Sequence, residues 1–181
     1  MKNGWIVAAV MAAATLLVPA AGAQMDSNTA RTVVSTQVYV SLEPVPRGRT
    51  FDVAVIAHIK PTFHINAHKV LDQFLIPTKL EGHFPAGFRL ASTGYPPGEL
   101  RKFSFSPKKL AVYTGQMIVR MKIKAASGAP LGPSDLPLSL HYQACNDTYC
   151  LPPVTVPVSV HLTVARAGSA AKAAHPEIFR R

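Results

Sequence analysis

The residues best suited to chemistry in this sequence are Cys145 and Cys150, the only two cysteines among its 181 residues. Four residues separate them, and so short a loop can bring two cysteines to the distance that a disulfide requires. A bridge across this loop restricts the unfolded chain little and contributes roughly 2 kcal/mol in the chain-entropy model. A bridge on an exposed loop is also within reach of an attacking thiolate. The spacing therefore leaves two interpretations open, a structural staple and a redox-active pair.

A metal site is a third interpretation of the same cysteines. Two cysteines together with two histidines can bind zinc or copper. The histidines available for such a site are His58, His64, His68 and His141. None of them stands at a tight ligand spacing from the cysteine pair, and export would favour the disulfide. We therefore expect no metal, and because no nucleotide, flavin or haem motif occurs, no other cofactor.

Two strand-like segments flank the cysteine pair and must position it. Apolar residues alternate with polar ones over residues 136–142 and again over 154–164, which is the period of a half-buried strand. The two runs predict an antiparallel hairpin that carries the cysteines on its loop. Pro157 within the second run indicates an edge strand.

Further strands are predicted along the rest of the chain, with turn signals between them. Residues 51–59 are apolar on both faces, which is typical of a central strand. Other strands are expected over residues 32–42, 74–80 with a break at Pro77, 88–90 and 110–125. No segment has a convincing helical period. The fold class we predict is all-β, an immunoglobulin-like antiparallel β-sandwich with the cysteine pair on a hairpin loop.

The two ends of the chain are expected to lie outside this domain, which we place at residues 32–164. Residues 1–23 have a basic start, an apolar run from Trp5 to Val18 and a small-residue site. This pattern predicts a secretory signal peptide that is cleaved after Ala23. Residues 24–31 are polar and expected to be flexible. Residues 165–181 are rich in alanine, glycine and basic residues and are expected to form a disordered tail.

The chain is basic, with a formal net charge of +10 at pH 7. The charge is spread along the sequence, and no nucleic-acid-binding motif accompanies it. We therefore exclude nucleic acid as a partner and interpret the charge as solubility and attraction to acidic surfaces. The predicted signal peptide places the mature chain outside the cytoplasm, where a disulfide is the default state of two cysteines.

Five stretches resemble one family. The strings Tyr142-Gln143-Ala144-Cys145 and Cys150-Leu151-Pro152-Pro153 are the specific part, and residues 63–67, 74–78 and 112–115 add weaker matches. Together they resemble the N-terminal periplasmic domain of the thiol:disulfide interchange protein DsbD. The resemblance implies an immunoglobulin-like domain that passes electrons from a membrane-embedded core to thioredoxin-like periplasmic proteins. No membrane domain follows residue 164 here, so a separate membrane electron donor is expected, and we expect a monomer.

The same resemblance implies roles for particular residues. Cys150 would form the mixed disulfide with a partner, and Cys145 would resolve it. A phenylalanine, either Phe103 or Phe105, would lie over the disulfide as a cap until a partner displaces it. The competing interpretation is that both rings plug the end of the sandwich as core.

The segment Phe63–His68 supplies the possible supporting residues, His64 and Asn66, and Tyr142 is a third. In an extended segment, alternate side chains project to one side, so His64, Asn66 and His68 would share a face. The resemblance leads one to expect tyrosines where His64 and Asn66 stand. His64 is either an ordinary surface histidine or, near the disulfide, a group that favours a thiolate when protonated or relays its proton when neutral.

The alternative function for the whole protein is that of a binding module with a purely structural disulfide.

Overall fold

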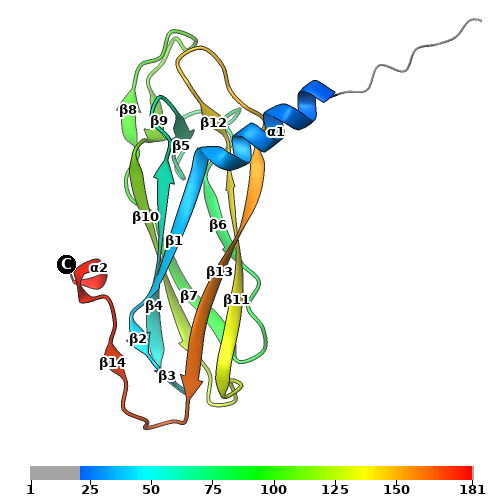
Figure 1. Cartoon of the computed structure of the whole chain (residues 1–181). Helices are drawn as coiled ribbons and strands as arrows, with labels where there is room; N and C mark the ends of the chain where they lie inside the picture. Colours follow the sequence, from blue (N-terminus) through cyan, green and yellow to red (C-terminus); the bar gives the residue numbers. More distant parts are fainter. Residues whose placement is uncertain (1–20, 181) are drawn as a thin grey trace, which may run out of the picture.

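The computed structural model describes residues 21–180, and two sheets packed face to face form the body of the domain (Figure 1). The first sheet has the order β1-β4-β10-β7, formed by Val34–Val40, Thr50–Ile59, Gln116–Ala125 and Phe88–Gly94. The second has the order β3-β13-β11-β6, formed by Val45–Pro46, Val154–Ala165, Gly132–Tyr142 and Lys79–Gly82. This arrangement confirms the predicted all-β, immunoglobulin-like sandwich.

A third, smaller sheet lies at one end of the sandwich, at the top of Figure 1. Its order is β12-β5-β9-β8, formed by Ala144–Cys145, His64–Asn66, Leu110–Tyr113 and Glu99–Arg101. Its strands are short. Three of them lie next to strands of the main sheets in the sequence: β5 follows β4, β9 precedes β10 and β12 follows β11. The cysteine pair belongs to this end sheet, so the two main sheets serve as its rigid support.

The predicted central strand and the predicted hairpin are both confirmed. Strand β4 pairs with β1 on one side and β10 on the other, and its inward residues are almost completely buried. Strands β11 and β13 pair antiparallel along their whole length, with Leu138 opposite Val158. The only other neighbour of β13 in its sheet is β3, which reaches just Val164 and Ala165. Pro157 therefore lies on a free edge, where its missing N–H costs no ladder bond.

The single strand predicted over residues 110–125 is two strands in the structure. Strand β9 joins the end sheet, whereas β10 joins the first main sheet. Gly115 between them has φ of 60°, a left-handed conformation that glycine adopts at little cost. The Gly115 carbonyl also accepts a hydrogen bond from the Ile59 amide at 2.7 Å. At this turn the chain passes from the end sheet, which holds the cysteines, to the first main sheet.

The edge strand predicted from Phe74 begins only at Lys79, in β6. Asp72 forms a turn in front of it, since its carboxylate accepts a hydrogen bond from the Phe74 amide at 3.0 Å and its carbonyl accepts one from Leu75. The Phe74 side chain is 84% exposed. The apolar run here is therefore a surface loop, because local turn chemistry outweighs β-propensity.

Both segments that the sequence predicted to be loose have regular structure. Helix α1 spans Ala21–Val33 and buries Ala30 and Val33 against the sandwich. At the other end, β14 (Lys172–Ala173) pairs with β2 (Leu42–Glu43), and the short helix α2 (Pro176–Phe179) follows. The Arg120 guanidinium donates a hydrogen bond to the Ile178 carbonyl and fastens this tail to β10. Composition alone missed these tertiary contacts.

The predicted signal peptide is mostly beyond the reach of the structure. Its residues 1–20 lie outside the described residues, and the proposed cleavage site after Ala23 falls within α1. Neither α1 nor any other helix within residues 21–180 combines the length and apolarity that a membrane crossing requires.

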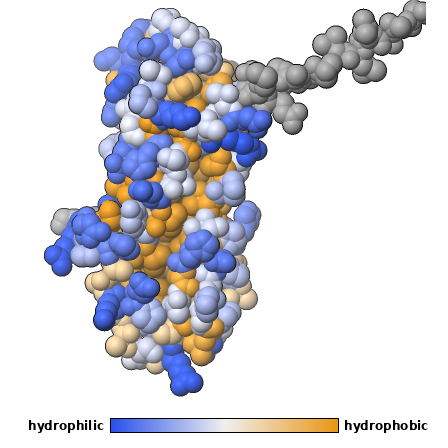
Figure 2. All heavy atoms as spheres, viewed as in Figure 1, coloured by the Kyte–Doolittle hydropathy of each residue, from blue (hydrophilic) through white to orange (hydrophobic). Residues whose placement is uncertain are grey.

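One side of the sandwich is open. Figure 2 shows a band of apolar surface along the domain, and an open groove of about 450 Å³ lies there between the edges of β1 and β13. The half-buried residues Val38, Val40 and Leu162 line it. The groove lies along the main sheets and does not include the cysteines.

Candidate functional site

Cys145 and Cys150 form a disulfide, as the sequence allowed. The loop between them is shaped by Asn146, whose side-chain oxygen accepts hydrogen bonds from the amides of Thr148 and Tyr149, each at 2.9 Å. The Asn146 amide in turn donates to the Tyr149 carbonyl at 2.9 Å. These bonds form a compact turn that holds the two cysteines as a bridged pair of residues at the end of the hairpin. Because both sulfurs belong to the disulfide, neither cysteine is a thiolate that could bind a metal ion.

The two cysteines have very different environments. Cys145 belongs to β12 and is only 3% exposed, whereas Cys150 lies after the turn and is exposed. Cys145 is held by the pairing of β12 with β5, in which it stands directly opposite His64. An attacking thiolate from solvent can therefore approach the Cys150 sulfur more readily than the Cys145 sulfur.

Three aromatic rings stack beside Cys145. The Phe103 ring lies 4.1 Å from the His64 ring, centroid to centroid, and the Phe105 ring lies 5.3 Å from that of Phe103. Phe103 is 8% exposed and packs with Leu110 and Val112, whereas Phe105 is 42% exposed. Of the two alternatives for the cap, Phe103 is thus the inner ring. Its stacking partner His64 stands opposite Cys145 in the pairing of β5 with β12.

The loop that carries the rings is bonded directly to the disulfide loop. The Ser104 hydroxyl donates a hydrogen bond to the Asp147 carbonyl at 3.0 Å. Ser104 stands between the two phenylalanines, and Asp147 stands between the two cysteines. Opening of either loop therefore breaks a bond to the other, a link that no sequence pattern indicated.

His64 is a buried residue, contrary to the expectation that an ordinary histidine lies at the surface. It is 3% exposed, and its Nε2 has no hydrogen-bond partner among the described residues. Burial lowers the pKa of His64 to about 4; the Asp147 carboxylate acts in the opposite direction and the Arg101 guanidinium adds to the lowering. The imidazole is therefore neutral near neutral pH, which disfavours the role as a cation.

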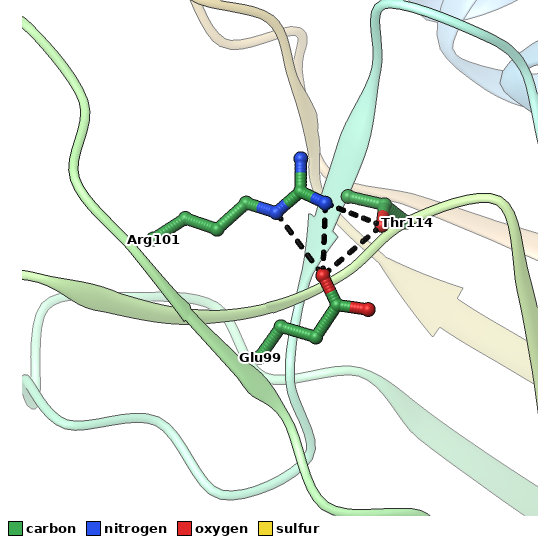
Figure 3. A network of polar contacts seen from close by, with 3 residues as sticks. All are labelled: Glu99, Arg101 and Thr114. Carbon is green, nitrogen blue, oxygen red and sulfur yellow. Dashed lines mark hydrogen bonds and ion pairs between the residues drawn. The ribbon is translucent and has the colours of Figure 1, made fainter.

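An open hollow of about 450 Å³ lies beside the ring stack. His64, Phe103, Arg101 and Asp147 are among the residues that line it. Figure 3 shows how Arg101 is held at this position: its guanidinium forms an ion pair with the Glu99 carboxylate at 2.9 Å and donates to the Thr114 hydroxyl at 3.3 Å. No sequence pattern indicated this network, because its three residues have the types that most protein surfaces carry.

The two other predicted supporting residues hold neighbouring segments. The Asn66 side chain is buried and donates a hydrogen bond to the Ile76 carbonyl at 3.0 Å, so it fixes the loop whose Leu75 packs on Phe103. The fully buried Tyr142 hydroxyl donates to the Ala30 carbonyl of α1 at 2.7 Å. Burial raises the pKa of Tyr142 to about 12, so this hydroxyl stays protonated. The hydrogen bonds of both side chains therefore have a structural role.

The remaining histidines of the metal interpretation do not gather at the site. His68 stacks on Tyr95 with ring centroids 3.7 Å apart, His58 contacts Gln37, and His141 contacts Thr155. Within residues 21–180, no group of three or more histidine, cysteine or acidic side chains is arranged to hold a metal ion.

Acid is expected to destabilise the folded protein through His64. The unfolded chain takes up this proton near the ordinary pKa of 6.5, whereas the folded chain takes it up only near 4. Between these values the unfolded state binds more protons, so stability should fall by roughly 2–3 kcal/mol as the pH falls through this window. Urea unfolding of the oxidised protein across the window measures it.

The matched control for this prediction is His64→Phe, which keeps a ring on Phe103 but cannot titrate. Its stability should depend on pH less steeply by the same 2–3 kcal/mol, with the carboxylates accounting for what is left. Identical pH dependence in the two proteins would contradict the assignment to His64.

Comparison with known families gives one match. The family model for the N-terminal domain of the thiol:disulfide interchange protein DsbD matches residues 29–161, well over half of the chain and including both cysteines. No curated protein sequence matches.

Among solved structures, the N-terminal periplasmic domain of ScsB from Proteus mirabilis is similar, with a TM-score of 0.46 and 9% sequence identity over 71% of this chain. The match covers 46% of the ScsB chain, so the present sequence spans about half of that relative's length. A chain from the AAF fimbriae of enteroaggregative Escherichia coli, studied for fibronectin binding and biofilm formation, has a TM-score of 0.28 and 17% identity, covering 71% of this chain and 100% of that chain. The family assignment rests on the sequence match alone: the chain belongs to the family of the N-terminal domain of the thiol:disulfide interchange protein DsbD.

Proposed function

We propose that this domain passes reducing equivalents between exported proteins through a reversible Cys145–Cys150 disulfide. The observation that carries the proposal is the unequal exposure of the two cysteines, with Cys150 at the surface and Cys145 buried on a strand. A purely structural staple has no need for one accessible sulfur. An exchange centre does need it, because a partner must reach one sulfur in line with the bond that breaks.

The exchange has two steps. A thiolate of the partner attacks the Cys150 sulfur, a new disulfide joins the two proteins, and the Cys145 sulfur leaves with the electron pair of the broken bond. A second thiolate of the partner then attacks the partner's own sulfur in the mixed disulfide, and the Cys150 sulfur leaves as a thiolate. The partner ends oxidised to a disulfide and this domain ends reduced, with two electrons transferred. The reverse sequence reduces a disulfide in another protein, so the potentials of the partners set the direction.

The stacked rings supply selectivity in this proposal. Phe103 closes the Cys145 side of the site, and the Ser104 bond to the Asp147 carbonyl holds its loop in place. A partner that offers replacement contacts can displace such a loop and reach Cys145, whereas a small thiol can reach only the exposed Cys150.

The partners we propose are thioredoxin-like proteins of the periplasm and a membrane electron donor of the DsbD type. Family membership supports thiol-redox partners in general, and the predicted signal peptide supports an exported, periplasmic location. The basic surface favours acidic partners by long-range attraction.

The reduction potential of the Cys145–Cys150 pair tests the proposed function. We expect a value between about −180 and −240 mV, in the range of exchangeable protein disulfides. The purified protein is equilibrated in graded glutathione buffers, its free thiols are trapped, and the added mass is counted. The double variant Cys145→Ser/Cys150→Ser provides the blank.

A potential below about −300 mV would overturn the proposal, since structural disulfides lie there. The function would then be that of an immunoglobulin-like binding module whose bridge only supports the fold.

A further inference from the structure

Opening of the disulfide creates a chemical problem at Cys145. When the partner attacks Cys150, the electron pair of the broken bond goes to a sulfur that is 3% exposed. A thiolate in apolar surroundings is unfavourable because burial raises thiol pKa values. The burial of Cys145 leaves little water in contact with its side chain to stabilise the charge. A donor within the protein would lower the cost.

His64 is placed to be that donor. It stands directly opposite Cys145 in the antiparallel pairing of β5 with β12, so the two side chains lie on the same face with Cβ atoms about 5 Å apart. Its Nε2 is buried and has no partner among residues 21–180 in the oxidised state. Leaving such a group unpaired costs about 1–3 kcal/mol, so a partner that exists only in another state is the natural explanation.

We propose that the Nε2–H of neutral His64 donates a hydrogen bond to the Cys145 thiolate that forms when the disulfide opens. The inference rests on the proposed function and assigns a further role at the same site. No proton leaves the imidazole in this step: the sulfur keeps the electron pair, the hydrogen bond spreads its charge, and water from the adjoining hollow supplies the proton that later converts the thiolate to the thiol.

The charged groups that face His64 do not replace this donor. Asp147 carries a negative charge, which opposes a thiolate. Arg101 carries a positive charge, but the Glu99 carboxylate holds it in an ion pair. A hydrogen bond from a neutral ring adds stabilisation without adding a charge that would itself need solvation.

The test measures thiolate formation at Cys145 alone. In the full-length Cys150→Ser protein, ultraviolet absorbance of the thiolate is followed against pH, with and without His64→Phe. The phenylalanine keeps the stack on Phe103 but cannot donate. We expect His64→Phe to lower the thiolate fraction about tenfold at any pH below the midpoint. The matched control is His68→Phe, which also replaces a stacked histidine but lies against Tyr95, away from the cysteines, and should leave the curve unchanged.

A second measurement needs no substitution of His64. In Cys150→Ser, NMR of the histidine ring nitrogens should show the His64 Nε2–H signal move in step with the Cys145 titration. Superimposable thiolate curves for His64→Phe and its parent, or a His64 signal that does not change during the Cys145 titration, would overturn the inference.

Neither readout needs a protein partner or a particular reduction potential. A potential below about −300 mV removes the proposed function whatever these curves show, and unchanged curves with a potential in the exchange range remove the role of His64 alone.

Discussion

Cys150→Ser is expected to abolish formation of a mixed disulfide with oxidised glutathione, whereas Cys145→Ser is expected to form one that persists. In Cys145→Ser the remaining thiol is the exposed one, and no second cysteine is present to resolve the adduct. In Cys150→Ser the remaining thiol belongs to Cys145, a residue that is 3% exposed in the native fold. Mass spectrometry of each reduced variant after exposure to oxidised glutathione measures the adduct.

The two variants control for each other. Both lose the same short-loop disulfide, and the chain-entropy model gives each the same loss of about 2 kcal/mol. A difference in adduct formation therefore reports on access and reactivity, not on stability. Equal adduct yields, or a higher yield on Cys145, would contradict the assignment of Cys150 as the attacking cysteine. That assignment came from resemblance, and the exposure of the two residues gives it an independent physical reason.

The sequence predicted the support of the site better than the site itself. The alternation in residues 136–142 and 154–164 required only that one face of each strand be buried, and that is a local property of the pattern. The disulfide followed from two cysteines in a short loop. The end sheet could not be predicted in this way, because β5, β9 and β12 are too short to show a period and are defined by pairing between distant segments.

His64 illustrates the limit most clearly. Histidine is usually exposed or half-buried, and the polar alternation around it is consistent with a surface strand. Its burial depends on Phe103, which lies 39 positions later in a loop that has no periodic signal. Two phenylalanines in such a loop were the available signal, and they allowed either a core plug or a cap. Which ring lies inside depends on packing with Leu75, Leu110 and Val112, which the sequence does not specify.

Phe103→Ala is expected to make Cys145 reactive. Removing a buried phenylalanine costs about 3 kcal/mol of packing, and if that packing keeps the loop closed, the open population rises roughly 100-fold. In the Cys150→Ser background, alkylation of the Cys145 thiol by iodoacetamide should therefore accelerate by at least about tenfold. The rate of mass gain at fixed pH measures the alkylation rate.

The same substitution admits water to His64, so the pKa of His64 should rise from about 4 toward its ordinary value, because burial is the main cause of its lowering.

Phe105→Ala is the matched control for the cap. Phe105 belongs to the same loop and the same ring stack, but it is 42% exposed and lies on the outside. Its loss removes little buried area, so Cys145 should react at nearly the parental rate. If Phe105→Ala accelerated alkylation as much as Phe103→Ala, the general mobility of the loop would control access. If neither variant changed the rate, β12 and its neighbours would be what buries Cys145, and Phe103 would belong to the core. Only a response confined to the inner ring supports a cap, because Phe103 is the ring that stacks directly on His64, the residue opposite Cys145.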